Sequence, residues 1–403
     1  MSGPIRFTVL DHCTESAART GTVDTPHGSF QTPAFMPVGT RATIKGLLPE
    51  QVRHIGSEII LTNAYHLMLR PGDEAVRDRG GVHAFMRWDG PMLTDSGGYQ
   101  AWSMADINAM TDEGVAFKSI IDGRRILLSP ERAIEVQNNL GPDIIMALDD
   151  CPPSLSGPSA HVEHLRPELA AALRKRAGAD QRGRVVEAVE RTARWLDRCV
   201  AAHGRSDEQG LFGIVQGGGV PELRARSVEH VTQHDLPGYA IGGVAVGESP
   251  EDIAETVAMT ASLLPEDRPR YLMGVGYERD LVAAVRSGVD MFDCVLPTRN
   301  GRNAGGFTRN GRLQLRNARF KDDDGPIEAG CDCPACSGGF SRAYLRHLFH
   351  AGEMLGAILL SLHNLRHFQR LMLDIRAAIR DDAWPAFALA WPVAGLHTDH
   401  RVH

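Results

Sequence analysis

The sequence predicts an α/β protein, a (β/α)8 barrel of the TIM type with a smaller inserted subdomain. The first observation is a set of eight short apolar runs: AFMPVG, EIILTN, PMLTDSGG, DIIMALDD, LFGIVQGG, YAIGGVAVG, YLMGVG and DMFDCVLP. Continuous apolar runs are typical of strands buried on both faces of a parallel sheet. The second is that amphipathic stretches such as SPERAIEVQNNLG and PEDIAETVAMTASLL lie between most of the runs, which predicts crossover helices.

Two of the expected helices carry a start signal. Ser129 and Ser249 each precede a Pro-Glu pair. A serine in this place accepts a hydrogen bond from the first helical turn, while proline and an acidic residue suit that turn. We therefore expect helices to begin directly after both serines.

Two segments interrupt the repeat of strand and helix. Residues 157–205 are rich in Arg, Glu, His and Ala and predict a long helical insertion with a solvated charged face. Residues 303–363 contain a dense cysteine cluster. We therefore expect one barrel formed by residues 1–302 and 364–403, with residues 303–363 as the inserted subdomain. A barrel with insertions can reach the 403 residues of this chain as one unit.

The composition limits the possible partners. The chain has no apolar run of the roughly 18 residues that a membrane span needs, and its start lacks the pattern of a secretion signal, so we expect a cytoplasmic protein with no membrane contact. A net charge of −7 argues against general nucleic-acid binding. One local stretch, Arg299 to Lys321, is basic and has no acidic residue. It is either a nucleic-acid contact or a solvated hairpin.

Polar side chains close several of the apolar runs. Barrel enzymes place their chemistry at the carboxyl ends of the strands, where such residues would meet. Each alone is explained by a loop hydrogen bond, but their repetition at one end of successive runs favours a site. The residues are Asn63, Asp95, Ser96, Asp149, Asp150, Gln216 and Asp293.

The cysteine cluster predicts a metal site. Cys331, Cys333 and Cys336 form a CxCxxC element, and three thiolates need one more ligand to complete a tetrahedral zinc site. Spacing alone does not choose among the downstream candidates His347, His350, His363 and His367. Four protein ligands leave no open position for water, so the predicted Zn2+ is structural.

Several strings together identify a family. In order and approximate spacing, the chain from about residue 32 to about residue 375 resembles the bacterial tRNA-guanine transglycosylases. The strings are PMLTDSGGYQ, FKSIIDG, LSPERAIEVQ, YAIGGVAVGE, YLMGVG, MFDCVLPTRNGRN and the CxCxxC element. The resemblance implies a barrel with a zinc-binding subdomain, and its pattern selects His363 as the fourth zinc ligand.

The resemblance also implies roles for individual residues. Asp293 in MFDC matches the nucleophile, and Asp95 in TDSGG matches the acid/base group, which also contacts the base. Tyr99 and Met273 match positions that sandwich the purine. The implied substrate-binding set is Asp95, Ser96, Tyr99, Asp149, Cys151, Gln216, Gly243, Val246 and Met273. Arg299 and Arg302 match positions that contact the tRNA anticodon loop, which favours the nucleic-acid interpretation of the basic stretch.

The implied reaction belongs to queuosine biosynthesis. Guanine at the wobble position of GUN-anticodon tRNAs, those for aspartate, asparagine, histidine and tyrosine, is exchanged for the 7-deazaguanine preQ1 through a covalent ribosyl-aspartate. A carboxylate attacking C1′ is a reasonable route for exchanging a base without cutting the RNA. Cys151 and Val246 match the bacterial pocket, where the valine leaves less room for the larger base queuine. The family further suggests a homodimer.

Other interpretations have less support. A non-catalytic RNA-binding partner would not need both Asp95 and Asp293, and a glycosidase or nucleosidase would need neither the zinc subdomain nor the basic stretch. The archaeal branch carries extra C-terminal RNA-binding domains for which the chain has no room. The sequence departs from the usual family pattern at four positions, all close to the expected site: Thr62, Ala64, Ala101 and Trp102.

Overall fold

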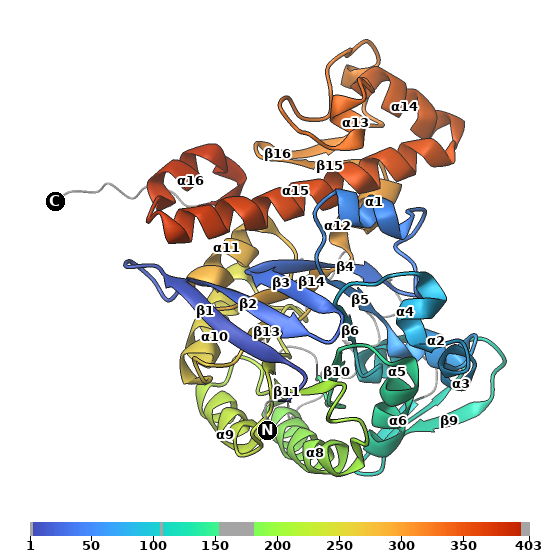
Figure 1. Cartoon of the computed structure of the whole chain (residues 1–403), viewed down its shortest axis with the longest axis vertical. Helices are drawn as coiled ribbons and strands as arrows, with labels where there is room; N and C mark the ends of the chain where they lie inside the picture. Colours follow the sequence, from blue (N-terminus) through green and yellow to red (C-terminus); the bar gives the residue numbers. More distant parts are fainter. Residues whose placement is uncertain (1–2, 105–107, 153–180, 396–403) are drawn as a thin grey trace.

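A computed structural model of the chain describes residues 3–104, 108–152 and 181–395. Its centre is a closed barrel of eight strands in the order β10-β11-β12-β13-β14-β4-β5-β6, all paired in parallel (Figure 1). The strands are β4 (Ala34–Gly39), β5 (Ile60–Thr62), β6 (Met92–Thr94), β10 (Ile144–Met146), β11 (Gly210–Val215), β12 (Tyr239–Ile241), β13 (Arg270–Leu272) and β14 (Met291–Cys294). Each lies in or overlaps one of the eight apolar runs, so the predicted barrel is confirmed.

Helices surround the barrel. They are α1 (Pro49–His54), α2 (Ala64–Leu69), α3 (Asp73–Arg77), α4 (Gly81–Met86), α5 (Gly98–Met104), α6 (Pro130–Leu140), α8 (Gln181–Ala202), α9 (Pro221–Thr232), α10 (Pro250–Leu263), α11 (Glu278–Arg286) and α12 (Leu296–Arg302). Ser129 and Ser249 cap α6 and α10 through their side chains, as predicted. The expected insertion at 157–205 contains α8, and its residues 157–180 lie outside the described residues.

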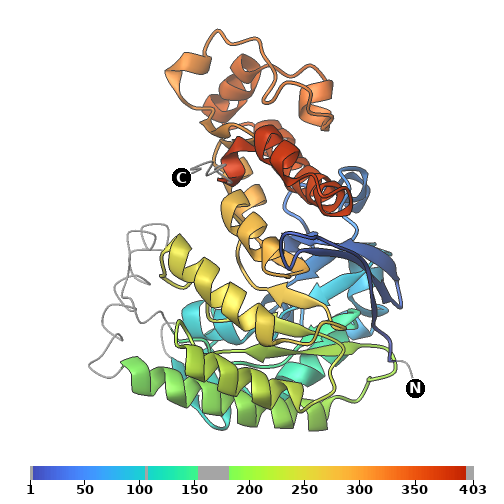
Figure 2. The same ribbon diagram turned by 90° about the vertical axis from the view of Figure 1, so that its left-hand side faces the viewer.

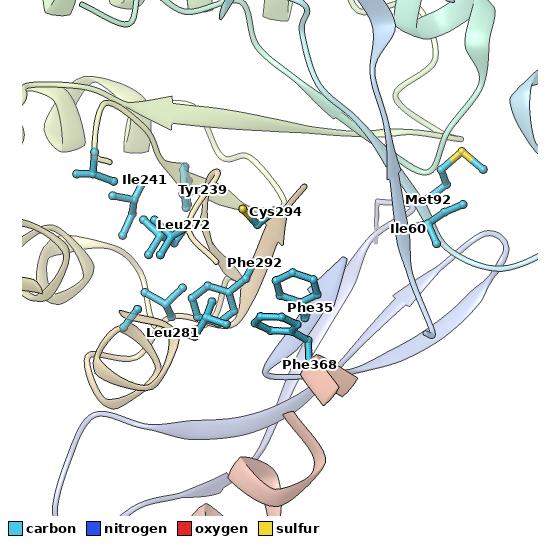
Figure 3. Close-up of a cluster of buried hydrophobic side chains, with 14 of the residues drawn as sticks. Phe35, Ile60, Met92, Tyr239, Ile241, Leu272, Leu281, Phe292, Cys294 and Phe368 are labelled. Carbon is cyan, nitrogen blue, oxygen red and sulfur yellow. The ribbon is translucent and has the colours of Figure 1, made fainter. Parts of the chain in front are cut away.

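Side chains alternate between the two faces of the barrel wall. Met291 belongs to the cluster that fills the barrel interior, and its neighbour Phe292 belongs to the outer core beneath the helices. Figure 3 shows part of that outer core, in which Phe35 stacks on Phe368 with ring centroids 4.8 Å apart. Because the side-chain period of a strand is two, Asp293 is the next inward position after Met291, at the carboxyl end of β14.

Two antiparallel sheets add to the barrel. The first contains β1 (Arg6–His12), β2 (Arg19–Thr25) and β3 (Gly28–Thr32). Its Val23 and Phe30 belong to the same cluster as the barrel interior, so it covers the amino-terminal end of the barrel. The first strand of the chain, β1, thus lies outside the barrel. The second sheet contains β7 (Asn108–Thr111), β8 (Gly114–Lys118) and β9 (Arg125–Leu128), which the sequence analysis did not predict.

A C-terminal lobe lies across the long helix α15 from the barrel (Figures 1 and 2). The lobe contains β15 (Gly305–Thr308), β16 (Gly311–Gln314), η2 (Ala318–Phe320), α13 (Pro334–Ser337) and α14 (Arg342–Ala351). After α15 (Met354–Arg380), the segments α16 (Trp384–Ala390) and η3 (Pro392–Ala394) pack in the outer core of the barrel. In α15, Leu360 belongs to the core of the lobe and Phe368 to that of the barrel. The predicted domain boundary at residue 363 falls inside this helix, and the division into domains stays a prediction.

The helices in the described ranges are all too short or too polar to cross a bilayer.

Candidate active site

Asp293 is held at the end of β14 by two donors. The Tyr271 hydroxyl donates to its Oδ1 at 2.6 Å, and the backbone N–H of Gly274 donates to the same oxygen at 2.8 Å. Burial raises the pKa of this carboxyl, and the two hydrogen bonds act in the opposite direction. Since both donors use Oδ1, Oδ2 accepts no hydrogen bond from the described residues.

Asp95 follows β6 and is more extensively hydrogen-bonded. Its Oδ1 accepts from the backbone N–H of Ala64 at 2.8 Å, while its Oδ2 accepts from the side-chain amides of Asn63 and Gln100. Burial and the charge of Asp293 nevertheless raise the pKa of Asp95 to about 6. The electrostatic effect of Asp293 indicates that the two carboxyl groups face the same site. Asp95 can therefore gain or lose a proton near neutral pH.

A third buried carboxyl lies at the end of β10. Asp149 Oδ2 accepts from Gln216 Nε2 at 2.6 Å, yet burial and the charge of Asp150 raise the pKa of Asp149 to about 7. Gln216 in turn lies against Gly243, where a Cβ would stand 2.2 Å from Gln216 Oε1. The φ of +62° at Gly243 also disfavours any other residue. Glycine at this position therefore lets the backbone pass close to the Gln216 side chain.

Arg224 supports this group from behind. Its side chain is fully buried on α9 and donates to four backbone carbonyls at 2.7 to 3.1 Å. The acceptors are Val215, Gly218, Gly242 and Gly243, on the two loops that carry Gln216 and Gly243. Burial lowers the pKa of Arg224 to about 10, so the group remains a cation at neutral pH. A buried positive charge thus fixes both loops and favours negative charge in front of them.

Asp150 has the opposite surroundings to Asp149. Both of its carboxylate oxygens are ion-paired with arginines of α8, at 2.6 Å to Arg184 and 2.6 Å to Arg191. Its backbone N–H donates to the Thr192 hydroxyl of the same helix at 3.0 Å. Asp150 therefore anchors α8 to the barrel and is a structural residue.

The other predicted site residues lie around the three carboxyls. Tyr99, on α5, is 40% exposed, and its pKa is raised to about 12, mainly by burial of its hydroxyl group and then by Cys151. Burial also raises the pKa of Cys151 strongly, with Asp149 adding to the effect. Ser96 directly follows Asp95, Met273 directly precedes Gly274, and the Val246 N–H donates to Glu248 Oε2 at 2.7 Å.

The two predicted RNA contacts lie on α12, directly after β14. Arg299 is exposed and Arg302 is half-buried. The electrostatic effect of Arg299 on Tyr99 places this basic segment beside the same end of the barrel. Arg299 therefore lies near Tyr99, one of the predicted base contacts.

A second centre lies in the C-terminal lobe. Nδ1 of His363 lies 3.7, 3.4 and 3.5 Å from the Sγ atoms of Cys331, Cys333 and Cys336. Tetrahedral zinc, with bonds of about 2.3 Å to sulfur and about 2.0 Å to nitrogen, separates such ligands by roughly 3.5 Å. His363 Nε2 donates to the Phe307 carbonyl at 2.7 Å, which leaves Nδ1 free to bind a metal. The cluster can therefore hold a metal ion through four protein ligands.

Comparisons with known proteins identify the family of the chain. A family model described as "Queuine tRNA-ribosyltransferase" matches residues 13–166 and 159–392. A queuine tRNA-ribosyltransferase of Thermus thermophilus is 52% identical over 385 residues, which cover 96% of this chain and 93% of the relative. The chain belongs to the queuine tRNA-ribosyltransferase family. The predicted enzyme class, a pentosyltransferase, is thereby confirmed.

Two further relatives from other bacteria have the same description. The protein of Symbiobacterium thermophilum is 52% identical over 375 residues, 93% of this chain and 88% of the relative. That of Geobacillus kaustophilus is 46% identical over 382 residues, 95% of this chain and 94% of the relative.

Three of the four positions that depart from the usual family pattern have described surroundings. Thr62 is buried, with its hydroxyl 3.9 Å from the Met92 sulfur, and Ala101 is fully buried in the outer core. Ala64 contributes its backbone N–H to Asp95, a role that any residue other than proline could serve. The side chain of Trp102 lies outside the described residues.

Some supporting residues were missed from the sequence. Tyr271 and Gln100, which donate to Asp293 and Asp95, were not singled out, and neither was Arg224. A signal existed for Arg224, because it occupies the same helical face as the buried Val228 and Val231. An arginine at a core-facing position requires buried acceptors and therefore deserved notice.

Proposed function

We propose that this family member exchanges guanine at the wobble position of GUN-anticodon tRNAs for preQ1, a step of queuosine biosynthesis. The observation that carries the proposal is the pair of carboxyls at one end of the barrel, the partly buried Asp293 and the buried Asp95, with different hydrogen-bonding surroundings. Asp293 is held through Oδ1 alone, which leaves Oδ2 available for nucleophilic attack. The other has a pKa of about 6 and can transfer protons.

The reaction proceeds in two displacements. Oδ2 of Asp293 attacks C1′ of the ribose, and the bond to guanine N9 breaks with its electron pair leaving on the base. Asp95 supplies the proton that the departing base takes up. The incoming preQ1 then gives its N9 proton to Asp95 and attacks C1′, which releases the Asp293 carboxylate. Two inversions retain the configuration at C1′, and the kinetics are ping-pong.

Base recognition is assigned to the second group of residues. Asp149 accepts from the donors on the edge of the purine, while the Gln216 amide and the Gly243 N–H donate to its carbonyl oxygen and stabilise charge on the leaving base. Tyr99 and Met273 enclose the ring, because a base has to leave its stack to reach such a site. Ser96, Cys151 and Val246 complete the pocket, with Val246 favouring preQ1 over queuine.

The remaining parts of the proposal concern the ion and the partners. A structural Zn2+ bound by Cys331, Cys333, Cys336 and His363 fits the sulfur and nitrogen positions of the cluster. Arg299 and Arg302 contact the anticodon loop. A homodimer and a cytoplasmic location are further predictions.

The test combines exchange with trapping of the intermediate. Unmodified tRNA is incubated with labelled guanine, and incorporation is mapped to a nucleotide. A tRNA with its wobble guanine replaced by adenine is the control substrate. Incorporation elsewhere, or equal incorporation into the control, contradicts the proposed substrate.

Denaturing gels of the protein with tRNA and an inert base analogue test the nucleophile. The covalent adduct should be absent in Asp293→Asn, while tRNA binding persists. Asp95→Asn should lower exchange by about 10²- to 10⁴-fold, the usual loss for an acid/base group. An adduct that persists in Asp293→Asn but disappears in Asp95→Asn would reverse the two roles.

A further inference from the structure

One of the two donors to Asp293 lies in a loop that is open on one side. The Gly274 N–H, which donates to Asp293 Oδ1 at 2.8 Å, belongs to the connection between β13 and α11. Gly274 is exposed and has a φ of +74°, and a Cβ built on it would have none of the described atoms within 4 Å. The place of this N–H therefore depends on what holds the two ends of the loop.

The two ends of the loop are held in different ways. At the β13 end, the Met273 N–H donates to the Ile241 carbonyl at 3.3 Å, which continues the pairing of the strands. At the other end, α11 begins at Glu278, and its N-cap residue Tyr277 makes no side-chain capping bond. Instead, His367 Nε2 on α15 donates to Glu278 Oε1 at 2.8 Å. The start of α11 is thus bound to a helix that lies outside the barrel.

The His367 imidazole is closely enclosed. It is buried, and three aromatic rings have centroids 5.0 to 6.0 Å from its own: those of Trp391, Phe368 and Phe307. Its Nδ1 has no hydrogen-bond partner in the described part of the chain. The bond to Glu278 therefore sets both a distance and a direction between α15 and α11, whereas apolar contact has no preferred direction.

The same helix also contacts the other side of the nucleophile. Asn364 on α15 donates to the Pro297 carbonyl at 2.9 Å, in the first turn of α12, which directly follows β14. His363, the predicted zinc ligand, lies one turn before His367 on α15. Figure 1 shows α15 running across both α11 and α12. The helix that joins the lobe to the barrel thus contacts the elements on both sides of Asp293.

From this arrangement we propose that His367 is a positioning residue for the nucleophile. Its hydrogen bond to Glu278 fixes the start of α11 and keeps the Gly274 N–H on Oδ1 of Asp293, so that Oδ2 stays directed at the ribose. The inference rests on the proposed role of Asp293. A displacement of about 1 Å in a reacting group costs on the order of 100-fold in rate. Loss of the bond should therefore slow the attack on C1′ by about 10- to 100-fold.

The rate of adduct formation in a single turnover tests the proposal. The zinc-loaded full chain, in excess over tRNA, is mixed with an inert base analogue, and samples are read on denaturing gels. The variant is His367→Leu/Glu278→Leu, because an apolar pair can replace a buried polar pair without loss of the fold. Its adduct should form about 10- to 100-fold more slowly than that of the parent. Affinity for tRNA should stay within about twofold, since the basic residues of α12 are unchanged.

Two further variants separate positioning from stability. In His367→Gln, the amide nitrogen is as many bonds from Cα as the imidazole Nε2 and can donate to Glu278, so the adduct rate should return to within about threefold of the parent. Ile375→Ala removes a fully buried side chain of the same helix from the outer core. It should lower the Tm and leave the adduct rate unchanged.

Each outcome has a defined meaning. A parental adduct rate in the double leucine variant would overturn the proposal, and so would a rate in His367→Gln as low as that of the leucine pair. An equal loss of rate in Ile375→Ala would show that the rate follows stability alone, which also overturns it. No adduct in the parent would instead refute the role of Asp293 as the nucleophile, and the inference with it.

Discussion

Replacing Asp149 with asparagine is expected to stabilise the free protein while it impairs base recognition. Burial raises the pKa of Asp149 from 3.8 to about 7, which means that ionising the carboxyl at this position opposes folding. An asparagine has nearly the same shape and can still accept from Gln216 through its oxygen. It carries no charge at any pH, so the cost of a buried ionised group is removed.

The sign and size follow from proton linkage. Between pH 3.8 and 7 the native state binds more protons at Asp149 than the unfolded state, so the free energy of unfolding falls as the pH rises through this range. The difference of about three units between the two pKa values corresponds to roughly 4 kcal/mol at pH 8, and to roughly 1 to 2 kcal/mol at pH 5. The stability gained by Asp149→Asn over the parent should therefore grow by roughly 2 to 3 kcal/mol from pH 5 to pH 8.

Urea unfolding at both pH values, without tRNA or base, measures this difference. Asp95 also has a raised pKa, but it titrates in both proteins and largely cancels in the comparison. Asp150→Asn is the matched control, because it leaves Arg184 and Arg191 without their acid and should destabilise by about 3 to 5 kcal/mol. A gain for Asp149→Asn that is the same at pH 5 and pH 8 would refute the reasoning.

Three further changes have defined outcomes. Arg224→Met should raise KM for guanine about tenfold or more, because a tenfold change corresponds roughly to the free energy of one charged hydrogen bond. An unchanged KM would mean that the two loops keep their shape without Arg224. Cys333→Ser should lose bound zinc and soluble protein together, measured by metal analysis of the soluble fraction; a folded, active, zinc-free variant contradicts a structural ion. Val246→Gly should increase the turnover of queuine relative to preQ1 by about 5- to 150-fold, which corresponds to roughly 1 to 3 kcal/mol of steric misfit. Equal turnover of both bases by the parent would show that Val246 does not select between them.

The barrel was predictable because its strands are buried on both faces. In β11, all six residues of Gly210–Val215 are buried, and such a strand leaves a continuous apolar run in the sequence. The runs also fixed where the site would be, since their carboxyl ends carry Asp95, Asp149 and Asp293.

The sheet of β7, β8 and β9 left no comparable signal. Its strands have four or five residues, and β9 alternates between exposed and buried side chains as RILL, which reads equally well as a loop. In β9, one side chain is partly buried and one is buried. Two such residues are too few to distinguish a strand from irregular chain by sequence pattern.

Contacts between distant elements were also beyond the sequence. Tyr271 lies in an apolar run, and nothing in the pattern indicates that its hydroxyl contacts Asp293. The two residues are 22 positions apart in the sequence but lie on the paired strands β13 and β14. The choice of His363 among four histidines came from the family resemblance, because spacing does not reveal which face of α15 meets the cysteines.

Asp149 and Asp150 explain why one site can contain a destabilised carboxyl without loss of the fold. The two residues are chemically identical neighbours, yet consecutive side chains of extended chain point to opposite sides. Asp149 therefore faces Gln216 inside the barrel, where burial opposes its charge, and Asp150 faces two arginines of α8 outside it. The ion pairs of Asp150 hold the segment in the register that keeps Asp149 beside Gln216. A shift of one residue would put Leu148 beside Gln216 in one direction, or Cys151 beside the two arginines in the other, so the tandem pair also fixes the register of the chain after β10.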